Sequence, residues 1–76
     1  MASTERIKIE IGFDGGQVMG AHVTAAAADA LEAALMAVGG PEALALDADD
    51  GRYLVALRRI VYVKRYAREA RLGFGG

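Results

Sequence analysis

Residues 6–13 read RIKIEIGF, and their apolar and polar side chains alternate strictly. Successive side chains of a β-strand point to opposite faces, so this segment is predicted to be a strand with one buried side. Two adjacent glycines in Asp14-Gly15-Gly16 supply the positive φ angles of a tight turn, and residues 17–23 are expected to return as a second strand. The predicted buried side of the first strand consists of Ile7, Ile9, Ile11 and Phe13.

An alanine-rich helix is predicted over residues 25–38, immediately after the two strands. Thr24 is suited to cap its first turn, because a threonine hydroxyl accepts a hydrogen bond from an otherwise unpaired amide. Gly39 is expected to end the helix, and Pro41 prevents its continuation. Helical spacing places three larger apolar side chains on the side that packs against the sheet: Leu31, Leu35 and Val38.

The second half of the chain is predicted to be mostly strand. Residues 43–48 alternate, Asp49-Asp50-Gly51 is typical of a hairpin turn, and residues 53–57 return. Arg58-Arg59 then interrupts the apolar pattern before residues 60–66, which indicates a short turn or bulge between two strands or a single bent strand. The expected fold class is α+β, a small antiparallel ββαββ sheet with a fifth strand and with one helix packed on one face.

The 76 residues provide for one domain, predicted at residues 6–66, with a disordered leader at 1–5 and an Arg/Gly-rich tail at 67–76. Cysteine is absent, so neither disulfides nor thiolate zinc sites are available to stabilise so small a core. Association with a second copy is an alternative source of stability.

The sequence has no apolar run long enough to span a bilayer and no secretory signal pattern, so a cytoplasmic location is expected.

The formal net charge of −1 hides a strong asymmetry along the chain. Residues 1–51 contain two basic and nine acidic residues, whereas residues 52–76 contain seven basic residues and one acidic residue. Such asymmetry is typical of proteins with a nucleic-acid or protein partner. The two parts can also complement each other, either within one fold or between subunits.

The sequence contains no residue pattern that supports catalysis or metal binding. His22 is the single histidine, and Ser3, the single serine, lies in the predicted leader without a base nearby. The glycine pairs do not connect a strand to a helix N-terminus, as a phosphate-binding loop requires. We therefore predict that the chain is not an enzyme and has no catalytic residues, no cofactor and no metal. Three carboxylates beside Gly51 faintly resemble a calcium loop but lack its ligand spacing: Asp47, Asp49 and Asp50. Asp49 and Asp50 are interpreted as turn residues.

The basic C-terminal third is the candidate binding surface, because its arginines and lysine are interleaved with tyrosines. Such a mixture can stack bases and neutralise phosphates, or it can bind a protein. The structural alternative is that the tyrosines are half-buried and the arginines protect a sheet edge from aggregation. The candidate binding residues are Arg58, Arg59, Tyr62, Lys64, Arg65, Tyr66, Arg68 and Arg71.

The leading functional hypothesis is a non-catalytic interaction or assembly module. It would form a homo-oligomer or dock on a protein partner through its sheet face and its basic C-terminal strand and tail. The second hypothesis is a module that binds RNA or single-stranded DNA through the same residues. Nucleic-acid modules usually have an isoelectric point above about 9, whereas this chain has one near 5.7. Binding of a nucleotide or another anion ranks third, and membrane binding is not expected.

Five segments carry a resemblance: strand 6–13, the single helix, turn 49–52, strand 60–63 and tail 71–75. Together they resemble an uncharacterised family of short bacterial proteins, a domain of unknown function of similar length. The resemblance covers most of the chain, and its most specific parts are strand 60–63 (IVYV) and tail 71–75 (RLGFG). The family has a Pro-Ala-Asp-Lys type of turn where this chain has ALRR at 56–59, and a glutamate where this chain has Lys64. The resemblance implies the α+β fold and the cytoplasmic location, and it assigns no site residues.

Overall fold

The computed structural model describes residues 6–67, which contain five strands and one α-helix. The elements follow one another in the predicted order, and the predicted α+β class is confirmed. The predicted leader at 1–5 and residues 68–76 of the predicted tail lie outside the described residues. The elements are β1 (Arg6–Phe13), β2 (Val18–Thr24), α1 (Ala25–Met36), β3 (Ala43–Ala48), β4 (Gly51–Ala56) and β5 (Ile60–Arg65).

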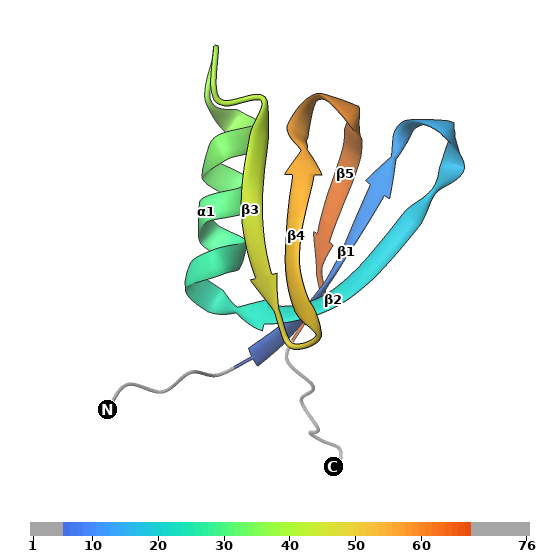
Figure 1. The fold of residues 1–76 in the computed structure, drawn as a ribbon, viewed down its shortest axis with the longest axis vertical. Coiled ribbons are helices and arrows are strands. Elements are labelled where there is room, and N and C mark those ends of the chain that lie inside the picture. Colours follow the sequence, from blue (N-terminus) through green and yellow to red (C-terminus); the bar gives the residue numbers. More distant parts are fainter. Residues whose placement is uncertain (1–5, 68–76) are drawn as a thin grey trace.

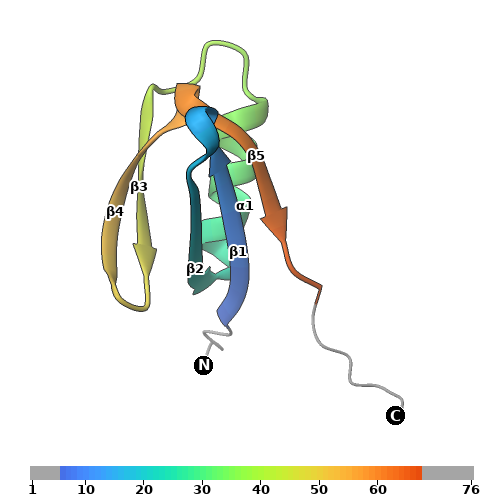
Figure 2. The ribbon, with the colours of Figure 1, turned by 90° about the vertical axis from the view of Figure 1, so that its right-hand side faces the viewer.

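The first strand is the centre of a three-stranded antiparallel sheet with the order β2-β1-β5. Its alternating apolar residues fill the inner side, as predicted, and Ile9 and Ile11 are completely buried. The helix α1 covers this inner side and lies behind the sheet in Figure 2. The opposite side of the sheet therefore stays uncovered by the helix.

The hairpin of β3 and β4 forms a second, two-stranded sheet, whereas the sequence suggested one continuous sheet. The hairpin lies beside β2 and α1 (Figure 1). At its tip, the Asp49 amide donates a hydrogen bond to the His22 carbonyl over 3.1 Å. At its other end, the Leu57 amide donates to the Glu42 carbonyl over 2.9 Å. Within residues 6–67, β2 and β3 do not pair as neighbouring strands, so the sheet is divided between them.

The core lies between the two sheets and the helix and is entirely apolar among residues 6–67. Each of the three layers contributes alternate or helically spaced side chains, so the sequence periodicity translates directly into burial. The buried side chains are Ile9, Ile11, Ala21, Val23, Ala28, Leu31, Leu46, Val55 and Leu57.

The helix begins as predicted and ends earlier than predicted. The Thr24 hydroxyl accepts a hydrogen bond from the Ala27 amide over 3.1 Å, which confirms the predicted cap. The helix ends at Met36, because Ala37 already has extended backbone angles, φ −77° and ψ 132°. Val38 consequently leaves the packed side and is fully exposed, so its predicted place in the core is wrong.

Short 3-10 turns connect the strands at two places. In the first turn Gly15 and Gly16 have φ angles of 88° and 91°, which confirms the predicted need for glycine. The second turn, Leu57–Arg59, separates β4 from β5 and excludes the single bent strand. The pairing of β5 with β1 is irregular beside this turn: Gly12 pairs with Tyr62 and Phe13 with Ile60, which leaves Val61 as a bulge.

Candidate functional site

The side of the β2-β1-β5 sheet that α1 does not cover is called the open face. Strand register brings its residues together, because Glu10 of β1 lies opposite Lys64 of β5 and Gly12 lies opposite Tyr62. Alternation then places the side chains of these residues on the same side of the sheet. The open face consists of Lys8, Glu10 and Gly12 of β1, Val18, Gly20 and His22 of β2, and Tyr62, Lys64 and the adjoining Tyr66.

Glu10 is the centre of a hydrogen-bonded cluster on the open face. The Tyr66 hydroxyl donates to Glu10 Oε1 over 3.0 Å, and the Tyr62 hydroxyl donates to Glu10 Oε2. These two hydrogen bonds favour the carboxylate and lower the pKa of Glu10 below its ordinary value. The same bonds raise the pKa of both tyrosines, because they favour the protonated hydroxyl. Both aromatic rings are thereby held in defined positions.

Two lysines contact the ring of Tyr66 in this cluster. Lys8 Nζ lies 4.9 Å and Lys64 Nζ lies 4.4 Å from the ring centroid, distances typical of cation–π contacts. Both lysines are near enough to Glu10 to help lower its pKa, but within residues 6–67 neither lies within ion-pair distance of a carboxylate. These lysines are therefore the cations of the described chain that are available to an external anionic group.

The predicted residues Arg58 and Arg59 do not join this cluster. They lie in the turn before β5, at the end of the strand far from Tyr66. Arg58 forms an ion pair with Glu42 at 3.5 Å, and Arg59 forms one with Asp14 at 3.3 Å. Each pairing joins a basic residue of the last third to an acidic residue of the first part, within one chain.

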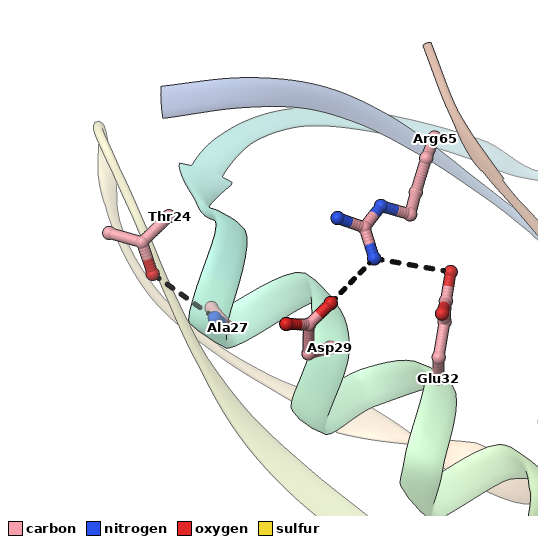
Figure 3. Close-up of polar contacts among 5 residues, drawn as sticks. All are labelled: Thr24, Ala27, Asp29, Glu32 and Arg65. Carbon is pink, nitrogen blue, oxygen red and sulfur yellow. Dashed lines mark hydrogen bonds and ion pairs between the residues drawn. The ribbon is translucent and has the colours of Figure 1, made fainter. Parts of the chain in front are cut away.

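Arg65 lies on the opposite side of the sheet from its neighbour Lys64. It reaches the helix, where its Nη1 atom lies 2.7 Å from Asp29 Oδ1 and 3.4 Å from Glu32 Oε2 (Figure 3). The predicted grouping of Arg65 with Lys64 and Tyr66 on one surface does not agree with this geometry, because adjacent strand residues point to opposite sides. Arg65 instead links β5 to α1.

The described arginines are thus all engaged, since Arg6 pairs with Asp49 at 3.2 Å and Arg52 pairs with Asp47 at 2.9 Å. The charge asymmetry of the sequence is largely compensated inside the fold. The predicted residues Arg68 and Arg71 lie outside the described residues. Of the predicted binding residues, the structure brings together Tyr62, Lys64 and Tyr66.

Three residues of the open face were missing from the predicted set: Lys8, Glu10 and Gly12. The alternating pattern of the first strand already placed Lys8 and Glu10 on its exposed side, and this pattern could have identified them. The missing information was that β5 pairs with β1. A Cβ atom at residue 12 would overlap the ring of Tyr62, so glycine at this position makes room for that ring.

The carboxylates of the hairpin tip are engaged as turn and ion-pair residues. Asp47 and Asp49 pair with arginines, and Asp50 Oδ2 accepts a hydrogen bond from the Tyr53 hydroxyl over 2.6 Å. That hydrogen bond raises the pKa of Tyr53. In the part of the chain that the structure describes, no group of three histidine, cysteine, aspartate or glutamate residues has the geometry of a metal site.

Comparison of the chain with family models, with curated proteins and with solved structures found no match to any of them. The resemblance to the uncharacterised bacterial family therefore stays a prediction. Among residues 6–67, no helix is both long and apolar enough to cross a membrane. The open face and its contacts are accordingly the basis for the functional proposal.

Proposed function

We propose that this protein is a non-catalytic interaction module that docks on an acidic segment of a protein partner through its open face. The observation that carries the proposal is the cluster on this face, where both lysines of the chain contact one tyrosine ring without an ion-pair partner among residues 6–67. A carboxylate of the partner would complete these contacts.

The fixed positions of the two tyrosine rings in this cluster support a role in recognition. Glu10 holds the hydroxyls of Tyr62 and Tyr66, so the rings have little conformational freedom left to lose on binding. Tyrosine is enriched at protein interfaces because it combines a large apolar surface with a polar end. The rings are therefore suited to act as anchors.

The rest of the open face allows a close approach. On β2 it presents Val18, Gly20 and His22, and a Cβ at Gly20 would meet no atom. A polypeptide segment can lie across this shallow part of the sheet while its acidic side chains reach Lys8 and Lys64. Two copies of the chain meeting face to face would instead bring four ammonium groups together, so the charge favours a different, acidic partner.

The alternative of nucleic-acid binding receives less support from the same contacts. The described arginines pair with carboxylates of the same chain, and the ring of Tyr66 is already in contact with two lysines. Stacking of a base on this ring would have to displace them. Two available cations release few counterions, so binding to phosphates would be weak and only slightly salt-dependent.

Selection of peptides from a random displayed library on the immobilised protein tests the proposal. We expect the enriched peptides to be acidic, and a labelled enriched peptide to lose at least tenfold in affinity for the double variant Lys8→Glu, Lys64→Glu. The matched control is Arg58→Glu, Arg59→Glu, which makes the same change of charge away from the open face and should retain binding. Enriched peptides without acidic residues, equal loss in both variants, or tighter binding of a mixed single-stranded oligonucleotide would overturn the proposal.

A further inference from the structure

Among the residues that the structure describes, the strand β4 has one edge without a neighbouring strand. Within residues 6–67 its hydrogen-bonded neighbour is β3, and the other edge has no strand beside it (Figure 2). The Leu57 amide donates a hydrogen bond to the carbonyl of Glu42, the residue just before β3. This bond continues the register in which Val55 pairs with Leu44, two positions further along. Hydrogen-bonding direction alternates along an antiparallel strand, so the backbone groups of Arg52, Leu54 and Ala56 point away from β3.

The β4 edge lacks the features that normally prevent pairing with another strand. Proteins protect an exposed edge with bulges, proline or charged side chains, especially lysine. The edge of β5 has such protection, because Val61 forms a bulge and Lys64 follows it. By contrast, the register of β4 is regular, and Arg52, its one charged residue, is paired with Asp47.

The outer face of the hairpin adds an apolar strip beside this edge. The side chain of Leu54 is 77% exposed, and Ala45, its pairing neighbour on β3, is exposed as well. Ala43 and Ala56, the next pair on this face, are also exposed and small. The solvent-facing side of the hairpin therefore offers an apolar contact surface at the centre of the free edge.

We propose that β4 pairs antiparallel with β4 of a second copy, about a twofold axis at Leu54, to join the two hairpins into one four-stranded sheet. In this register the outward backbone groups of the two strands can form about six hydrogen bonds. Leu54 of each copy lies beside the same residue of the other. Arg52 lies opposite Ala56 of the second copy, so no like charges face each other and its pair with Asp47 is retained.

A second copy fits this edge better than an unrelated strand because the pairing is self-complementary. Each residue of an isologous interface meets the same surface on its partner, and this arrangement closes at a dimer. The interface uses neither Lys8 nor Lys64 and stands apart from the proposed docking function. A single strand pair is small, so the dimer is expected at high protein concentration.

Sedimentation velocity over a range from low micromolar to several hundred micromolar tests this pairing. The wild-type protein should shift from monomer toward dimer, whereas Leu54→Lys and Leu54→Glu should each stay monomeric, because like charges then face each other. An equimolar mixture of the two variants should recover the dimer. The control Val61→Lys places the same charge on an exposed residue of the β5 edge and should dimerise like the wild type.

Circular dichroism of each variant verifies folding, since Leu54 is exposed and its replacement removes no core contact. Amide hydrogen exchange gives a second measurement: the Leu54 amide should become protected as concentration rises, while the Val55 amide, which faces β3, should be protected throughout. A monomer at every concentration, dimers of both single variants, or no recovery in the mixture would overturn the proposal. The double variant Lys8→Glu, Lys64→Glu should dimerise like the wild type. The dimer test and the docking test can therefore fail independently of each other.

Discussion

The ring of Tyr62 on β5 lies directly over Gly12 of β1, in the space that a Cβ atom at residue 12 would occupy. The two residues are paired across the sheet, and the hydroxyl at the end of the same ring donates to Glu10, two residues before the glycine. A glycine in a strand generally weakens it, so its presence here is explained by the close approach of the ring.

We expect Gly12→Ala to move the ring of Tyr62 off β1 without unfolding the protein. Tyr62 is partly exposed and can swing toward solvent, while alanine is favoured over glycine in a strand by roughly 0.5–1 kcal/mol. The free energy of unfolding should therefore change by less than about 1 kcal/mol. Nuclear magnetic resonance should show a loss of contacts between Tyr62 and β1 and a rise in the pKa of Glu10. If the variant keeps the contacts between Tyr62 and β1 and an unchanged pKa of Glu10, the close packing of this pair is contradicted.

The Glu10 cluster should make stability depend on pH at both ends of the range. The pKa of Glu10 is lowered below 4.5, so its contribution is present above pH 4.5 and is lost as pH falls through the lowered pKa. The pKa values of Tyr62 and Tyr66 are raised above 10.0, so their contribution is present below pH 10.0 and is lost as pH rises through the raised values.

Carbon-detected titration of the Glu10 carboxyl measures this pKa directly, and we expect a value below 4.5 in the wild-type protein. The double variant Tyr62→Phe, Tyr66→Phe should raise it, because both donors are removed. An unchanged Glu10 pKa in the double variant would show that the hydroxyls do not determine it.

Three positions of the helix region should differ strongly in their effect on stability. Leu31 is completely buried, so Leu31→Ala should lower the free energy of unfolding by about 2–5 kcal/mol. Leu35 is half-buried, and Leu35→Ala should cost less than Leu31→Ala. Val38 is fully exposed, and Val38→Ala should change stability by less than about 0.5 kcal/mol. Urea denaturation of the three variants gives the order, and a larger loss at Val38 than at Leu31 would be incompatible with this core.

The cap of α1 should contribute measurably because the helix is short. Thr24→Ala removes the acceptor for the Ala27 amide and should cost about 1 kcal/mol, whereas Thr24→Ser keeps a hydroxyl and should cost much less. Thermal unfolding followed by circular dichroism measures both variants. Equal melting temperatures for the alanine and serine variants would mean that the hydroxyl is not required.

Much of the local structure could be predicted from short-range patterns. Alternation identified the strands around Ile9 and Leu46, and the glycines at 15 and 16 identified a turn with positive φ angles. The end of the helix was predicted too late, since alanine-rich sequence continues through Ala37 while its backbone is already extended. Helical periodicity does not report where the chain must leave the helix to reach β3.

The candidate site was only partly predictable, for a different reason. The basic and aromatic residues of β5 were identified from composition, but Lys64 and Arg65 point to opposite sides of the sheet. Lys8 and Glu10 could be assigned to an exposed side, yet nothing in the sequence paired that strand with β5. Residues more than fifty positions apart, Glu10 and Tyr62, become neighbours only through this pairing.

The sequence by itself determined the order of the elements, the apolar side of the first strand and the position of the helix cap, because these depend on residues a few positions apart. The tertiary structure alone decided that β1 is the central strand, that β3 and β4 form a separate sheet, and that most arginines are neutralised within the chain. Several strand pairings are compatible with the local sequence of each strand. The packing of the whole core determines which of them forms, and this packing depends on residues from every segment of the chain.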